Sequence, residues 1–198
     1  MKRFSSWMFL LAIVTLVGFG CTKASPAPQE KSPETIDRNA ILLEAKQSGL
    51  IMDDGELGHM KDPVVLVQDE KKAKAPDVKL FATESFKSWR AAALADVTGG
   101  TSYGLAYTKF EKGSFTLYAK MGGLPVPSDG YHYEGWIVKR NDGMRVIDVG
   151  TAVQEKDQFL NIYSSLEDLT GYDFYVLTLE PNDDNSSPAE HLLEGMIR

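Results

Sequence analysis

The strongest constraint on the fold is a regular succession of short strand-like segments that begins near residue 91 and continues to residue 198. Turn residues such as Gly99-Gly100 and Asn141-Asp142-Gly143 separate the segments at intervals of roughly eight to twelve residues, which is typical of antiparallel sandwiches or of sheets that close on themselves. The predicted strands cover residues 94–98, 103–110, 115–121, 131–139, 144–150, 158–164, 173–179 and 191–197. We therefore predict a mainly β domain over 91–198, an antiparallel, immunoglobulin-like β-sandwich of about eight strands.

Side-chain patterns in this region indicate which residues form the core. In 115–121, apolar and polar residues alternate, which predicts one buried face and one wetter face. Aromatic residues in strands mostly fill cores. We therefore expect Trp136 to be a core residue rather than a platform for a ligand.

The residues before the strand region favour a short helical segment at 34–61. Ser32-Pro33 is typical of a helix start, and Gly49 is typical of a helix end. A second helix start is predicted at Asp53, with Glu56 three residues later. Residues 62–90 are expected to be a linker with one short strand at 64–67. Acidic residues interrupt the lysines of 69–79, which favours a solvated linker over a basic binding patch.

The N-terminal residues have the pattern of an export signal. Lys2 and Arg3 precede an uncharged, mostly apolar run at 7–20, which ends at Cys21. This run is shorter than the ~20 residues of a spanning helix, and the arrangement resembles a bacterial lipoprotein signal peptide. We expect residues 1–20 to be removed, Cys21 to carry a lipid of the palmitate type, and residues 21–33 to form a flexible tether. In the alternative, a secretory signal or signal anchor with an incidental Cys21, the rest of the chain also lies outside the cytoplasm.

Charge and cysteine content exclude several classes of protein. The chain has 21 Lys and Arg against 28 Asp and Glu, a net charge of −7, which argues against a general nucleic-acid binder. A single cysteine excludes a disulfide framework and a zinc site with paired thiolates. The expected location is the outer face of the cell membrane, or the outer membrane. The expected partners are the membrane, through the lipid at Cys21, and an envelope protein.

Two sets of short motifs stand in a fixed order in the strand region: a Leu-Pro turn before a Tyr-x-x-Trp strand, then a strand that ends in Thr-x-Glu-Pro. Their residues are Leu124, Pro125, Tyr133, Trp136, Thr178, Glu180 and Pro181. In this order they resemble the extracytoplasmic C-terminal domain of anti-sigma-K factor proteins, over about residues 91–198. The resemblance implies that these residues are marks of the fold. Anti-sigma factors of this kind begin with a cytoplasmic sigma-binding domain, whereas this chain begins with an export signal, so we expect no direct sigma-factor binding.

The sequence offers few candidates for chemistry. His132 and His191, with Glu134 near the first, are weak candidates for zinc or copper ligands, because no two histidines have a local ligand spacing. The loop 182–185 lacks the spaced acids of a calcium loop and is expected to be a solvated turn. No nucleophile elbow, zinc-protease helix, phosphate loop or dinucleotide motif is present. We expect no metal, no cofactor and no catalytic residue.

These observations predict a membrane-anchored extracytoplasmic lipoprotein whose β domain is a non-catalytic binding module. Two alternatives stay open. One is a metal-binding or redox-related envelope protein that uses His132, His191 and nearby carboxylates. The other is an accessory sensor in envelope signalling, which acts through a membrane partner.

Overall fold

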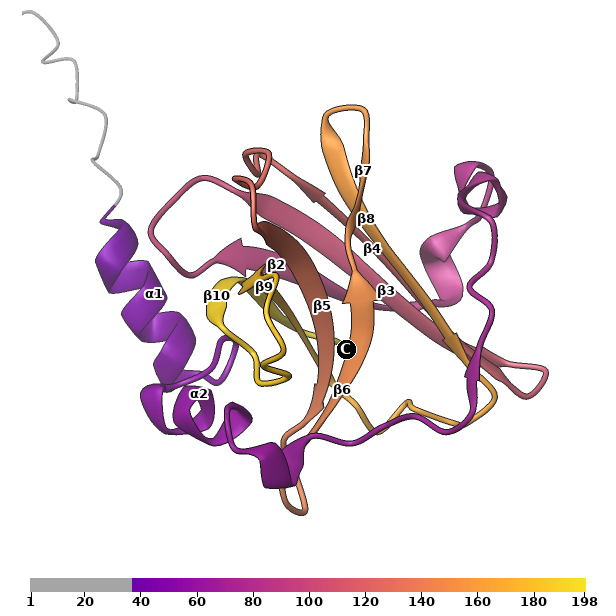
Figure 1. The fold of residues 1–198 in the computed structure, drawn as a ribbon, viewed down its shortest axis with the longest axis horizontal. Helices are drawn as coiled ribbons and strands as arrows, with labels where there is room; N and C mark the ends of the chain where they lie inside the picture. Colours follow the sequence, from indigo (N-terminus) through magenta and orange to yellow (C-terminus); the bar gives the residue numbers. More distant parts are fainter. Residues whose placement is uncertain (1–36) are drawn as a thin grey trace, which may run out of the picture. The chain divides into compact units, whose positions relative to one another are not determined.

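Alternating side chains and glycine turns give residues 37–198 ten antiparallel strands (Figure 1). The computed structural model describes these residues, and they form one compact unit. The predicted signal peptide, the lipid site at Cys21 and the tether at 21–33 lie outside the described residues. The strands are β1 (Lys72–Ala73), β2 (Arg90–Asp96), β3 (Tyr103–Glu111), β4 (Ser114–Gly122), β5 (Tyr131–Lys139), β6 (Arg145–Thr151), β7 (Val153–Glu155), β8 (Gln158–Ser165), β9 (Phe174–Pro181) and β10 (Glu190–Met196).

All ten strands belong to one hydrogen-bonded sheet. Its order is β1-β8-β4-β3-β2-β10-β9-β5-β6, and β7 pairs with β8 outside this path. The seam between β2 and β10 is short, with Leu193 opposite Asp96 and Glu194 opposite Ala95. It joins two halves, which we call the β3–β4 half (β1, β8, β4, β3 and β2) and the β5–β9 half (β10, β9, β5 and β6).

The sheet is curled, and its main core lies inside the curl. Side chains from both halves fill this core, including Leu117 and Met121 from the β3–β4 half and Ile137 and Leu177 from the β5–β9 half. Each such side chain contributes about 1.5–3 kcal/mol through removal of apolar surface from water. Opposite the seam, Asn161 Nδ2 on β8 donates a hydrogen bond to the Gly150 carbonyl on β6 at 2.6 Å, so the two halves also meet there.

The segment 37–89 covers two patches on the outer face of the sheet. Over the β5–β9 half, Met52 and Met60 pack against Trp136. Over the β3–β4 half, Phe81 packs against Tyr118. In Figure 1 this indigo-to-magenta segment passes from α1 and α2 at the left to two short turns at the right. Its helices are α1 (Arg38–Gln47), α2 (Asp54–Met60), and the 3₁₀ turns η1 (Pro63–Val65), η2 (Val78–Ala82) and η3 (Phe86–Ser88).

The structure confirms the mainly β class and the helical segment before it. A strand occupies each of the eight predicted ranges, with shifts of a few residues at the ends, and the short strands β1 and β7 add two more. The strands form one continuous sheet, whereas the expected immunoglobulin-like sandwich has two. The difference arises at the β2–β10 seam, where hydrogen bonds continue between the halves.

Some of the helix starts and ends predicted for residues 34–67 agree with the structure, and others do not. The capping box predicted at Asp53 and Glu56 is present, and Gly49 has a φ of 68° just after α1. The described part of α1 begins later than expected, with Asp37 as its N-cap. Residues 63–65 form a 3₁₀ turn where a strand was expected at 64–67, because Pro63 fixes its φ and lacks an N–H. Leu66 retains a single parallel bridge to Val146.

The motif residues that carry the family resemblance have structural roles. Leu124 packs on the core, and the Tyr133 hydroxyl donates to the Pro125 carbonyl at 2.9 Å, which fixes the turn before β5. Trp136 is buried, as expected, and β9 ends at Pro181. Within 37–198, no helix has both the length and the apolar character needed to span a membrane.

Candidate functional site

Strand alternation places a group of polar side chains on the outer face of the β5–β9 half. The register sets His132 opposite Glu180 and Glu134 opposite Thr178. A register shift at Gly135/Trp136 sets Trp136 opposite Asp148 on β6. The outer face of a strand usually meets water, whereas here part of this group lines a concave site.

The concave site is a cleft of about 360 Å³ between the sheet, the segment 63–68 and the loop after β9. Its acidic side chains are Glu134, Asp148, Glu180 and Asp183, and we call it the acidic cleft. Trp136 and Val146 supply apolar lining, and among residues 37–198 no lysine or arginine lines the cleft. Within this part of the chain, His132 is therefore the one lining side chain that can carry a positive charge.

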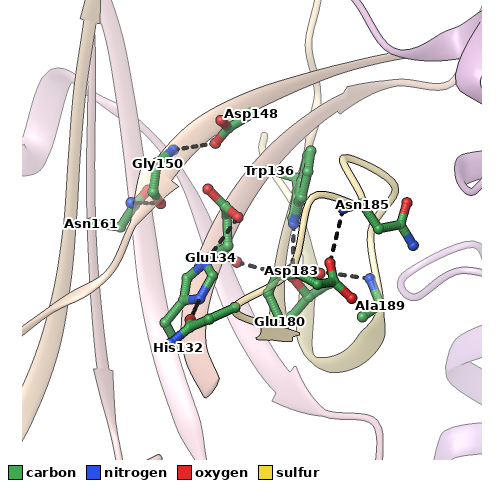
Figure 2. A network of polar contacts seen from close by, with 12 residues as sticks. His132, Glu134, Trp136, Asp148, Gly150, Asn161, Glu180, Asp183, Asn185 and Ala189 are labelled. Carbon is green, nitrogen blue, oxygen red and sulfur yellow. Dashed lines mark hydrogen bonds and ion pairs between the residues drawn. The ribbon is translucent and has the colours of Figure 1, made fainter. Parts of the chain in front are cut away.

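Hydrogen bonds fix the side chains around the cleft (Figure 2). His132 lies between two partners: its Nδ1 is 2.7 Å from Asn182 Oδ1, and its Nε2 is 3.3 Å from Glu134 Oε2. Glu180 accepts a hydrogen bond from the Ala189 N–H at 2.8 Å. These contacts hold the carboxylates in place before any ligand is present, which reduces the cost of binding.

The indole N–H of Trp136 fixes this side chain next to the polar residues of the cleft. The indole Nε1–H donates to Thr178 Oγ1 at 2.8 Å, and the ring is almost wholly buried. Buried indoles usually find such a partner. The ring therefore acts as a fixed wall of the cleft, in agreement with its predicted core role.

Glu134 is the electrostatic centre of the cleft. Its carboxyl lies between the side chains of Asp148 and His132 (Figure 2). Burial, followed by the repulsion of the Asp148 carboxylate, raises the pKa of Glu134 from 4.5 to about 7, and His132 acts in the opposite direction. Near neutral pH the carboxyl group therefore exists in both protonation states, a property that is enriched at functional sites.

The structure separates the two histidines that were candidates for a metal site. His132 and Glu134 are together in the acidic cleft, whereas His191 lies on β10, with β9 between them. His191 Nδ1 is 2.7 Å from Glu194 Oε1, and the other oxygen of Glu194 accepts from the Met52 N–H at 2.7 Å. Among residues 37–198, no group of three or more His, Cys, Asp or Glu has an arrangement that could hold a metal ion.

The acidic loop after β9 is organised by its own side chains. Asp183 accepts a hydrogen bond from the Asn185 N–H at 2.9 Å, and Asn185 accepts one from the Ser187 N–H at 3.1 Å. Such side-chain-to-backbone turns are typical of Asn and Asp in loops. The loop matches the turn predicted for residues 182–185, and Asp183 also lines the acidic cleft.

Asp148 is the site residue that sequence reasoning did not find. It stands on the outer face of β6 between Ile147 and Val149, which belong to the main core, and its Oδ1 accepts from the Gly150 N–H at 2.6 Å. An acidic residue in such a strand was a usable signal. Its partner could not be inferred, because the register shift at Gly135/Trp136 decides which residue it faces.

Comparisons with known proteins give no match: no family model, no curated protein and no solved structure is similar to this chain. Inferences about its function therefore depend on its own residues and geometry.

Proposed function

We propose that this chain is a membrane-anchored extracytoplasmic lipoprotein whose sheet unit is a non-catalytic module that binds a cationic group in the acidic cleft. The export pattern of residues 1–20 and the position of Cys21 support the anchoring part. The motifs similar to the anti-sigma-K C-terminal domain agree with an extracytoplasmic module. The geometry of the acidic cleft supports the binding part.

The observation that carries the binding proposal is the Glu134–Asp148 pair. The exposed Asp148 carboxylate repels the partly buried carboxyl group of Glu134, and His132 is the one basic group among the described residues that line the cleft. A bound ammonium or guanidinium group relieves this repulsion and gains charge-assisted hydrogen bonds. The cleft volume of about 360 Å³ suits a side chain or a small ligand.

A pair of isosteric probes tests the charge requirement. We expect N-acetylarginine amide to bind in calorimetry, and N-acetylcitrulline amide, which has the same shape without the positive charge, to bind at least about tenfold more weakly. Binding of N-acetylarginine amide strengthens between pH 6 and pH 8, because Glu134 ionises in this range. Glu134→Gln weakens it, whereas Glu190→Gln, on an exposed carboxylate outside the cleft, does not. Equal binding of both amides would contradict the proposal.

The anchoring part is tested in cells. We expect Cys21→Ala to abolish incorporation of labelled palmitate and to cause an unprocessed precursor to accumulate, because processing of a lipoprotein signal depends on that cysteine. Cell fractionation and immunoblotting detect both effects. Normal processing and membrane retention of Cys21→Ala would show an ordinary secretory signal or a signal anchor instead.

A further inference from the structure

An aromatic cluster covers the outer face of the β3–β4 half. The Phe81 ring stacks on Tyr118 with 4.5 Å between ring centroids, and the Phe86 ring stacks on Tyr107 at 4.2 Å. Trp89 packs edge-on against Phe86. Phe81, Phe86 and Trp89 come from the segment that was expected to be a linker, and Tyr107 and Tyr118 come from the sheet. The cluster fastens this segment to the sheet.

A pocket of about 490 Å³ opens beside the cluster, between η2 and η3 on one side and strands β3 and β4 on the other. Phe81, Phe86, Tyr107 and Tyr118 line it, and their ring stacks therefore continue to its wall. Its volume and its mainly apolar lining, which includes five aromatic residues, are typical of sites for small molecules. The pocket is separate from the acidic cleft, because no residue lines both.

Tyr103 presents an aromatic surface at the open end of this pocket. Its side chain is 62% exposed. The ring lies over Gly122, the residue opposite it on β4, where an added Cβ would be 2.9 Å from the phenol oxygen. The glycine lets the ring lie against the strand, which holds it in place although much of it is open to solvent.

The polar side chains that line the pocket include one positive charge, from a lysine. Lys120 and Gln158 line it, and no acidic side chain of the described residues does. Lys120 is exposed and takes part in none of the ion pairs formed by residues 37–198. The lysine gives the pocket a positive charge, whereas the chain as a whole has a net charge of −7.

We propose that this pocket binds a small ligand that has a planar aromatic ring and one anionic group, a carboxylate or a phosphate. The ring of the ligand extends the stacks of Phe81 on Tyr118 and Phe86 on Tyr107, and Tyr103 contacts it at the open end. The anion pairs with the Lys120 ammonium, and Gln158 supplies a neutral hydrogen bond. A neutral ring would use the aromatic wall but not the lysine, and a flexible acyl chain would not use the ring stacks.

Three matched probes test the proposal by calorimetry and by amide chemical shifts of the full chain: 2-naphthoate, 2-naphthyl phosphate and the neutral 2-naphthamide. We expect at least one anion to bind about tenfold more tightly than the amide, with shifts at Tyr103, Leu105 and Gln158. Whichever anion binds more tightly identifies the class of the ligand. Equal affinity for all three probes, or shifts confined to other regions, would overturn the proposal.

Substitutions locate the two parts of the site. Lys120→Gln removes the preference for the anions and leaves binding of 2-naphthamide unchanged, whereas Tyr103→Ala weakens all three. Lys74→Gln and Tyr131→Ala, on another exposed lysine and another exposed tyrosine, serve as matched controls and leave binding unchanged. Lys120 is on the surface, so the variant keeps its fold. An anion preference that survives Lys120→Gln rejects the site. This result is independent of the binding of cations in the acidic cleft.

Discussion

The acidic cleft and the aromatic pocket are built in the same way and have opposite chemistry. Each lies on the outer face of the curled sheet, where a part of the segment 37–89 meets the strands: residues 63–68 at the cleft, residues 81–86 at the pocket. From the part of the chain that the structure describes, the cleft has four acidic side chains and no lysine or arginine, and the pocket has one lysine and no acid. The net charge of −7 therefore agrees in sign with the cleft but not with the pocket, and the covering segment creates the hollow in both.

The largest effect is expected from a change that removes one site and spares the other. Phe81→Ala deletes a buried ring that stacks on Tyr118, and should lower the free energy of unfolding by about 3–5 kcal/mol. Its neighbour Leu80 is 64% exposed, and Leu80→Ala should change it by less than about 0.5 kcal/mol. Urea denaturation measures both. If the titration of Glu134 also changes in Phe81→Ala, the two regions are not independent.

A change at the seam should affect both regions together. An added Cβ at Gly195 on β10 would be 2.3 Å from the Ala93 carbonyl on β2, so Gly195→Ala must push the two halves apart. We expect a loss of about 3 kcal/mol and weaker binding at both sites. Gly58 in α2 has no atom near its Cβ position, and Gly58→Ala should gain up to about 1 kcal/mol. A loss confined to one site would show that the halves fold separately.

The part of the segment 37–89 that covers the β5–β9 half is held by the buried carboxylate of Glu194. Glu194→Ala leaves the Met52 N–H and the His191 ring nitrogen without their partner, so we expect a loss of about 2 kcal/mol. Hydrogen exchange at residues 50–60 should become faster, and exchange at residues 78–89 should not. Glu190→Ala, at an exposed carboxylate on the same strand, is the control. Unchanged exchange at 50–60 would show that apolar packing alone holds the cover.

The smallest effect is a dependence on pH. Because the pKa of Glu134 is raised in the folded state, the folded protein holds a proton that the unfolded chain releases, and stability falls as pH rises from about 5 to 8. Glu134→Gln mimics the protonated form. It should be about 1 kcal/mol more stable than the wild type at pH 8 and similar to it at pH 4, since partial exposure and His132 reduce the full effect. Parallel stability curves for the two proteins would contradict this.

Much of the strand pattern was predictable because it depends on local chemistry. Gly130 and Gly143 have positive φ values in the turns where the sequence predicted breaks, and the alternation in 115–121 gives the inner face of β4. The same alternation puts His132 and Glu134 on one face. The position of Asp148 opposite Trp136 and the short seam at Gly195 depend on register and on contacts between distant residues, which no local pattern encodes.

The sequence itself contains a signal for the aromatic cluster. Phe81, Phe86 and Trp89 stand close together in a segment that was expected to be a linker, yet three large rings within nine residues are costly to expose. They indicate a covering segment. The surroundings of His191, by contrast, have no local signal. Its partner Glu194 also accepts a hydrogen bond from the Met52 N–H, 142 residues away in the sequence. The separation of His191 from His132 could therefore not be inferred from the sequence.

The continuity of the segment 37–89 has a mechanical consequence. A force applied at residue 37 acts along a single strap that crosses the two sites in series. It first meets the hydrogen bonds from Arg38 to the Gly100 carbonyl and from Arg140 to the Gly49 carbonyl, and then the Met52–Glu194 contact. The residues that wall the acidic cleft follow, then the two-residue strand β1, and last the rings that wall the aromatic pocket. Tension would therefore detach the segment from the sheet in that order. The acidic cleft would lose its wall while the aromatic pocket is still intact.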